Sequence, residues 1–216
     1  MRSYGQYCAV AKALDVIGDR WTLLIVRELL QGGPSRYTDL RNGLPGIATN
    51  LLSERLRDLE AAGLVKREDA PPPVATALFS LTPRGEALGP VLHELGMWGV
   101  PYMTEGPASR DAFRGRWLAW PAENFLADGD PDAPPVALEL RVGGDSVVVE
   151  AAGGEIRTHP GPATQPDAVL TGPPHPILGL LSGAIDLAEA RRRGVELQGE
   201  EGVIARLRPA GGVPTA

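Results

Sequence analysis

The segment that most constrains the fold is residues 44–63, LPGIATNLLSERLRDLEAAG, because it separates apolar from polar side chains with helical spacing. A helix that starts near residue 48 puts four apolar side chains on one side, which we expect to be buried: Ala48, Leu52, Leu56 and Leu59. The other side carries polar side chains at i, i+3, i+4 and i+7, namely Asn50, Ser53, Glu54 and Arg57. Gly63 ends the pattern, so the predicted helix is short and amphipathic.

The polar side of this helix differs from a general solvated surface rich in Glu and Lys. It offers an amide, a hydroxyl and a guanidinium, which are groups that bond to base edges and phosphates. Taken alone, the segment could be any amphipathic helix with a mixed polar face. Its interpretation therefore depends on the elements around it.

Those elements follow the order of a winged helix-turn-helix. Two helices are predicted before the segment, over 9–17 and 19–33, and Ser35 can cap a short third one over 36–44. After it, 64–69 and 76–82 are predicted as paired strands, and Thr82-Pro83 opens a long helix. The 19–33 helix is expected to bury Trp21, Leu24, Ile25 and Leu29, and the long helix carries a stripe of Leu88, Val91, Leu92, Leu95 and Trp98.

Composition limits the class of protein. A chain of 216 residues exceeds one typical domain, so we expect domains over 1–104 and 105–208 and a disordered tail over 209–216. No run approaches the ~18 apolar residues of a membrane span, and no apolar targeting region is evident, so we expect a cytoplasmic protein without membrane contact. One cysteine and three scattered histidines favour neither a disulfide framework nor a metal site. No nucleophile–base pair, carboxylate dyad or phosphate-cradling loop is evident, so neither an enzyme nor a cofactor is expected.

Charge divides unevenly between the two halves. The first 104 residues carry 11 Lys and Arg against 11 Asp and Glu, so residues 105–216 hold the whole net charge of −6. A DNA-binding domain is often basic, so a neutral first half counts weakly against DNA binding, although a local cluster can still follow phosphates. The acidic second half would be repelled by DNA and is expected to bind something else.

Several separate blocks, in the expected order, resemble the HxlR-type winged-helix regulators. They are a cysteine upstream of LDVIGDRWTLLIVREL, then RYTDLR, GIATNLLSERLRDLEAAGLVKR, SLTPRGEAL and the pair Trp98-Gly99, together spanning roughly residues 8–103. The resemblance implies a bacterial transcription regulator, usually a homodimer whose first and last helices pair and whose reading helices enter successive major grooves of double-stranded DNA. The chain departs from the family at Ala48, where a serine N-cap is common, and at the wing tip 70–74, which has no positive charge and is not expected to enter the minor groove.

The predicted DNA contacts lie on the reading helix, the helix before it and the wing. Base or phosphate contacts are predicted for Asn50, Ser53 and Arg57, and phosphate contacts for Thr49, Arg36 and Tyr37. Arg55 either contacts the DNA backbone or pairs with Glu54 or Asp58. Lys66 and Arg67 alternate along a strand, so only one of them is expected to face DNA. Ordinary exposed polar positions are the alternative for all of these residues.

Cys8 is the other residue that could carry chemistry. The start of a helix and the ammonium of Lys12 one turn on both favour the reactive thiolate. Some members of the family sense oxidants or electrophiles at this position, which makes Cys8 a candidate redox sensor. The alternative is a small buried residue at a dimer interface. No second cysteine is present, so a switch would need a disulfide between subunits or an adduct with a small thiol.

The second half reads as α+β, with a helix near 110–127, strands paired across Gly143-Gly144, and helices toward the end. Its tail resembles the sterol carrier protein 2-like fold through the DAVLT strand, the apolar helix that ends at Gly183, and VELQG before a last helix, over perhaps residues 110–208. That resemblance implies an apolar cavity for a lipid-like or other hydrophobic ligand. Candidate lining residues are Trp117, Trp120, Ile177, Leu178 and Leu181; ordinary core packing explains the same residues and is the favoured interpretation.

The predicted fold class is therefore α+β, a winged helix-turn-helix followed by an α+β domain. The predicted function is a homodimeric DNA-binding transcription regulator, a repressor, whose second domain senses an apolar small molecule. The alternative is a lipid-like ligand carrier that uses its winged helix only for protein association.

Overall fold

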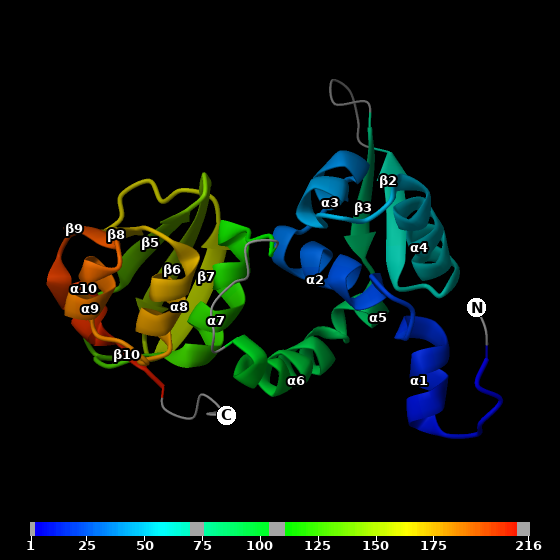
Figure 1. Cartoon of the computed structure of the whole chain (residues 1–216), viewed down its shortest axis with the longest axis horizontal. Coiled ribbons are helices and arrows are strands. Elements are labelled where there is room, and N and C mark those ends of the chain that lie inside the picture. Colours follow the sequence, from blue (N-terminus) through cyan, green and yellow to red (C-terminus); the bar gives the residue numbers. More distant parts are fainter. Residues whose placement is uncertain (1–2, 70–75, 104–110, 211–216) are drawn as a thin grey trace. The chain divides into compact units, whose positions relative to one another are not determined.

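The amphipathic segment forms helix α4, Thr49–Ala61, in the computed structural model, which describes residues 3–69, 76–103 and 111–210 (Figure 1). Leu52, Leu56 and Leu59 are buried as predicted, but Ala48 is the exposed N-cap residue and does not join them. The chain leaves α4 through Gly63, whose φ of 68° lies in the left-handed region that favours glycine. The Gly63 amide donates to the carbonyl of Glu60 at 3.0 Å, which ends the helix where the sequence predicted.

The N-terminal unit is the predicted winged helix-turn-helix. A small antiparallel sheet has the strand order β1-β3-β2, and Phe79 on its central strand faces Ser35 on one side and Arg67 on the other. From residue 9 to residue 103 the elements are α1 (Ala9–Ile17), α2 (Thr22–Gly32), β1 (Ser35–Arg36), α3 (Tyr37–Gly43), α4, β2 (Val65–Asp69), β3 (Ala77–Leu81), α5 (Pro83–Glu86), α6 (Gly89–Gly99) and the 3-10 helix η1 (Val100–Met103). The predicted wing tip, 70–74, lies outside the described residues.

Two helix predictions near the N-terminus were wrong in detail. Ser35 does not cap α3, because it pairs with Phe79 in β1, and the carboxylate of Asp39 instead accepts a hydrogen bond from the Arg36 amide at 3.1 Å. Leu24 is exposed rather than buried. The buried face of α2 is rotated from the predicted one and consists of Thr22, Ile25, Val26, Glu28 and Leu29.

The long helix predicted after Thr82 is divided in two. The Thr82 side chain caps α5 as predicted, since it accepts a hydrogen bond from the Gly85 amide at 3.2 Å. The chain then breaks before α6, none of whose residues is buried. Of the predicted apolar stripe, Val91, Leu95 and Trp98 are exposed, with Trp98 at 67% of its full accessibility, whereas Leu88 and Leu92 pack against the N-terminal core.

The C-terminal unit is an α+β fold around a five-stranded sheet of order β7-β6-β5-β8-β9, in which β5 and β8 run parallel (Figure 1). The hairpin predicted at Gly143-Gly144 joins β5 to β6. The predicted 110–127 helix is shorter than expected. The elements are η2 (Gly115–Leu118), α7 (Ala119–Phe125), β4 (Leu126–Asp128), β5 (Val136–Val142), β6 (Asp145–Ala152), β7 (Glu155–Pro160), β8 (Ala168–Thr171), α8 (Pro174–Leu181), α9 (Leu187–Arg192), β9 (Glu196–Gly199), α10 (Glu201–Arg206) and β10 (Leu207–Pro209).

The two units divide between Gly96 and Met97, eight residues before the predicted boundary at 104. Each unit has its own apolar core. Within the described ranges, no helix is long and apolar enough to cross a membrane.

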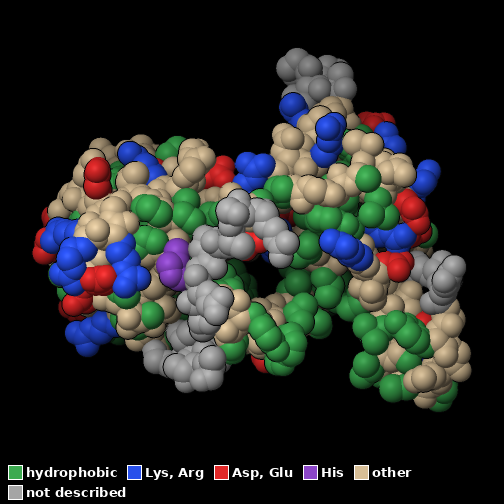
Figure 2. Space-filling model, viewed as in Figure 1, with side chains coloured by type: hydrophobic (Ala, Val, Ile, Leu, Met, Phe, Trp, Pro, Cys, Tyr) green, Lys and Arg blue, Asp and Glu red, His purple; other side chains and the backbone are tan. Residues whose placement is uncertain are grey.

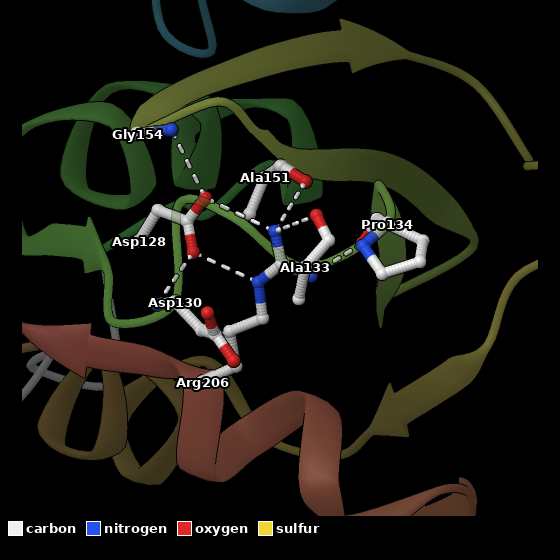
Figure 3. A network of polar contacts seen from close by, with 7 residues as sticks. All are labelled: Asp128, Asp130, Ala133, Pro134, Ala151, Gly154 and Arg206. Carbon is white, nitrogen blue, oxygen red and sulfur yellow. Dashed lines mark hydrogen bonds and ion pairs between the residues drawn. The ribbon is translucent and has the colours of Figure 1, made fainter.

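An ion pair fixes the end of the C-terminal unit (Figure 3). Arg206, the last residue of α10, donates from Nε to Oδ1 of Asp128 at 2.8 Å and from Nη2 to Oδ2 at 3.1 Å. The Asp128 side chain is fully buried and also accepts from the amides of Asp130 and Gly154. The guanidinium donates further to backbone carbonyls of Ala133, Pro134 and Ala151. This network attaches α10 and β10 to β4 and to the turn after β6.

Candidate nucleic-acid interface

The turn between α3 and α4 sets the direction of α4. Leu44 and Ile47 are buried in the N-terminal core and hold both ends of this turn. Gly46 lies between them with φ of 89°, a conformation that residues with a Cβ rarely adopt. The buried leucines of α4 face the same core, so its polar side points outward.

Tyr37 and Ser53 join α3 to the first turn of α4. The Tyr37 hydroxyl donates to the carbonyl of Thr49 at 2.7 Å. The Ser53 hydroxyl lies 3.0 Å from that carbonyl and 3.2 Å from Tyr37 Oη. Both residues were predicted as DNA contacts, and the structure places them in an internal cluster that positions the start of α4.

Arg55 is held by three carboxylates. Its Nη1 lies 3.0 Å from Oδ2 of Asp58 and also pairs with Asp19, which lies between α1 and α2. Its Nη2 lies 2.6 Å from Oε1 of Glu54. The Arg55 side chain is only 12% exposed. The ion-pair alternative therefore describes Arg55 better than a contact with the DNA backbone, and Asp19 is a partner that the sequence did not suggest.

The exposed stripe of α4 consists of Asn50, Glu54 and Arg57, one helical turn apart, with Thr49 exposed at the N-terminus. Within the described part of the chain, no carboxylate lies within ion-pair distance of Arg57. Its guanidinium is thus available to a ligand. Glu54 lies between the amide and the guanidinium. The helical spacing placed Glu54 on the polar side of α4. It was not among the predicted DNA contacts, because a carboxylate does not bind phosphate.

The other predicted contacts are also exposed. Lys66 Nζ lies 2.9 Å from Oε2 of Glu68 on the same strand, whereas Arg67 and Arg36 show no ion pair among the described residues. On the visible face of the N-terminal unit, Lys and Arg side chains are interspersed with acidic ones rather than gathered in one patch (Figure 2). That only one of the two wing residues faces DNA stays a prediction.

Cys8 occupies the N-cap position of α1 and is exposed. Hydrogen bonding from the backbone amides of Ala11 and Val10 lowers the pKa of its thiol. The predicted contribution of Lys12 is not seen, because its ammonium lies 3.5 Å from Oδ2 of Asp15 instead. Exposure in a single copy is compatible with both predictions, a reactive thiol and a residue that a second copy covers.

The C-terminal unit contains a cavity of about 280 Å³ between its sheet and α8, α10 and β10. Of the five residues predicted to line a cavity, Leu181 does so. The lining residues are Leu126, Leu138, Leu170, Leu180, Leu181, Gly183, Ile185, Asp186, Ile204, Leu207 and Pro209. Ile177 is fully buried in the core and Leu178 packs against that core. Trp117 and Trp120 make edge contacts with Phe113 and Phe125, respectively.

Known proteins resemble the region that contains this surface. The family model for the HxlR-like helix-turn-helix matches residues 16–107. The HTH-type transcriptional regulator YvaP of Bacillus subtilis is 39% identical over 92 residues, which cover 43% of this chain and 84% of the relative. The regulator sll1512 of Synechocystis is 37% identical over 43% of this chain and 70% of the relative, and YodB of B. subtilis is 32% identical over 44% and 83%.

A solved structure of YodB in its reduced form is 30% identical and covers 47% of this chain and 100% of that chain, with a TM-score of 0.40. The identity and coverage of the sequence relatives agree with the helix-turn-helix geometry of α3 and α4. The chain therefore belongs to the HxlR-like helix-turn-helix family and is a DNA-binding transcriptional regulator.

Proposed function

We propose that this regulator binds its operator as a homodimer, with α4 of each copy in the major groove, and represses the genes that it controls. The exposed stripe of α4 is the observation that carries this proposal. Asn50 and Arg57 lie on that stripe with Glu54 between them, and neither forms an ion pair with any residue that the structure describes. They belong to the residue types that read adenine and guanine.

The surroundings of α4 support two roles for the candidate residues: some position the helix, and others contact DNA. Tyr37, Ser53 and Arg55 use their polar atoms to attach α4 to α3 and to the loop before α2. A helix held in this way loses little side-chain and backbone freedom when it enters a groove. Thr49, Arg36 and Arg67 then serve as phosphate contacts that set the position of the protein on the duplex.

Exposed apolar side chains support the homodimer. Residues of α6 and η1 repeat at i, i+4, i+7 and i+11 and are all exposed: Val91, Leu95, Trp98 and Tyr102. On and before α1, Tyr7, Val10 and Leu14 are exposed as well. Exposed apolar side chains grouped on a helix face in this way mark a protein interface, and we assign them to pairing with a second copy.

A DNA-binding titration tests the assignment of α4. Wild-type protein is titrated against the DNA upstream of its own gene and against random DNA, with Arg57→Ala and the matched control Arg157→Ala, an exposed arginine of β7. We expect tighter binding to the upstream DNA, loss of that preference in Arg57→Ala, and no change in the control. Equal affinity of wild type for both DNAs at moderate salt would contradict the assignment. Repression is tested separately by a reporter gene, whose expression should rise when the regulator is deleted.

The apolar cavity supports a second activity, the sensing of a small hydrophobic molecule by the C-terminal unit. Its lining is apolar except for Asp186, whose carboxylate caps α9 by accepting from the Glu189 amide at 2.7 Å. A cavity of 150 Å³ holds benzene, so 280 Å³ suits a neutral molecule of about ten to twelve heavy atoms. We propose that this unit has the sterol carrier protein 2-like fold, whose apolar cavity would hold such a molecule. Native mass spectrometry of gently purified protein should show an added mass that apolar solvent removes.

Cys8 supports regulation by oxidation. The thiol is exposed and its lowered pKa increases the thiolate fraction at neutral pH. Two Cys8 thiols from two copies can lose two electrons and two protons to hydrogen peroxide, which is reduced to water, and form one disulfide. Non-reducing electrophoresis should then show a linked dimer that Cys8→Ser does not form. A wild-type chain that stays unlinked and whose DNA affinity is unchanged by peroxide would rule out this regulation.

A further inference from the structure

A carboxylate lies at the centre of the exposed stripe of α4. Glu54 is four residues after Asn50 and three before Arg57, and its side chain is 54% exposed. The hydroxyl of Ser53, on the same side of the helix, is instead directed to Tyr37 and Thr49. The three groups that α4 offers outward are therefore an amide, a carboxylate and a guanidinium.

The carboxylate opposes binding to DNA of arbitrary sequence. Phosphates repel it, and α4 as a whole carries Glu54, Asp58 and Glu60 against Arg55 and Arg57. A helix with one net negative charge does not enter a groove through charge attraction. Glu54 is favourable at this place only if a hydrogen-bond donor on the DNA meets it.

Glu54 is also held in position. Arg55 Nη2 contacts its Oε1 at 2.6 Å, and the same guanidinium is fixed by Asp19 and Asp58. No partner is seen for Oε2 among the described residues. One oxygen thus fixes the carboxylate, and the other remains as an acceptor beside Asn50 and Arg57.

The major groove offers few donors to such an acceptor. Guanine presents two acceptors and thymine an acceptor and a methyl group. Adenine has an amino group next to the acceptor N7, which repels a carboxylate, whereas the N4 amino group of cytosine has no acceptor beside it on its own edge. We propose that Glu54 reads a cytosine in each half-site by accepting a hydrogen bond from its N4 amino group. This inference rests on the proposed placement of α4 in the major groove.

Glutamine provides a sharp test, because its amide both donates and accepts and is suited to adenine N6 and N7. Binding sites are selected from randomised duplex DNA by the full chain as wild type, Glu54→Gln, Glu54→Ala and the control Glu60→Gln, which changes the same charge on the same helix off the stripe. We expect one C·G pair in each wild-type half-site, preferred by about 5- to 150-fold. It should become A·T in Glu54→Gln, lose all preference in Glu54→Ala, and stay unchanged in Glu60→Gln.

A second measurement uses only wild-type protein, so it tests the inference even if the variants fold poorly. Each cytosine of the selected site is replaced in turn by 2-pyrimidinone, which lacks the 4-amino group. Affinity should fall at least about fivefold at one cytosine per half-site. Unchanged base preference in folded Glu54→Ala, or no affinity loss at any cytosine, overturns the inference but leaves the proposed function intact. If wild type selects no sequence at all, the proposed placement of α4 fails and the inference fails with it.

Discussion

Two arginines on α4, only two residues apart, are predicted to have opposite roles, and alanine substitutions should separate them. Arg55 is mostly buried and surrounded by Asp19, Glu54 and Asp58, whereas Arg57 is exposed with no ion pair among the described residues. Arg55→Ala should therefore lower the free energy of unfolding, and Arg57→Ala should lower affinity for DNA.

The magnitude for Arg55 follows from the exposure of its partners. The carboxylates of Asp19, Glu54 and Asp58 are 57%, 54% and 37% exposed, so each pair contributes about 0.2–1 kcal/mol and the three share one guanidinium. The buried aliphatic stem adds packing against the helix. A total of about 1–2 kcal/mol is expected. For a unit of this size that corresponds to a melting temperature lower by roughly 4–16 °C.

The magnitude for Arg57 comes from the DNA. Removing the Arg57 side chain, which is exposed and has no ion pair among the described residues, should change the free energy of unfolding by less than about 0.5 kcal/mol. A bidentate contact with guanine contributes about 1–3 kcal/mol per half-site, so a dimer should lose about 2–6 kcal/mol of specific binding. If Arg57 instead meets a phosphate, the slope of log affinity against log salt should fall by about 0.9 for each lost contact.

Both quantities are measured on the same preparations. Circular dichroism gives the melting temperature, and fluorescence anisotropy at several salt concentrations gives the affinity, with Arg157→Ala as the control for loss of an exposed arginine. The reasoning is refuted if Arg55→Ala melts like wild type and loses as much DNA affinity as Arg57→Ala. That result would make Arg55 a DNA contact and its ion pairs incidental.

Three further predictions concern other parts of the molecule. Trp98→Asp, on the exposed stripe of α6, should leave folding intact but give a monomer in sedimentation and weaken operator binding, because the two half-sites are no longer bound together; an unchanged dimer would show that this face does not pair. Leu180→Trp should fill the cavity and abolish any co-purified apolar mass, and a retained mass would place the ligand elsewhere. Arg206 holds the pKa of Asp128 well below its usual value, so the Asp128–Arg206 pair stabilises the fold fully above about pH 4 and less as the pH falls further. In urea unfolding from pH 3 to 7, the free energy of unfolding should fall less toward low pH in Asp128→Asn than in wild type, and parallel curves would contradict this.

Sequence patterns predicted the elements whose determinants are local. The spacing of Leu52, Leu56 and Leu59 located α4, and the two glycines at 143–144 located the hairpin of β5 and β6. Exposure was harder to predict, because it depends on what covers a face. The apolar stripe of α6 has helical spacing, but spacing does not distinguish a face covered by the same chain from one covered by a second copy.

The cavity shows the same limit at longer range. Its lining comes from β4, β5, β8, α8, α10 and β10, which are brought together by the sheet order and by the contact of Arg206 with Asp128. The resemblance to the sterol carrier protein 2-like fold led to the prediction that Trp117 and Trp120 line it. Instead, their edge contacts with nearby phenylalanines occupy them locally, and smaller aliphatic side chains from distant segments enclose the cavity.

The different roles of the two arginines of α4 depend on one contact, between Arg55 and Asp19, that helical periodicity cannot reveal. On a helical projection Arg57 lies on the polar side and Arg55 lies beside it, and each has one acidic neighbour at i+3. What distinguishes them is Asp19, 36 residues before Arg55, which reaches its guanidinium only once α2 has packed beside α4. That distant carboxylate turns one arginine into a support for the helix, and the same support positions Glu54. In the proposed function, with Glu54 and Arg57 in the major groove, the specificity of α4 therefore depends on Asp19, a residue of the loop before α2 that itself need not touch DNA.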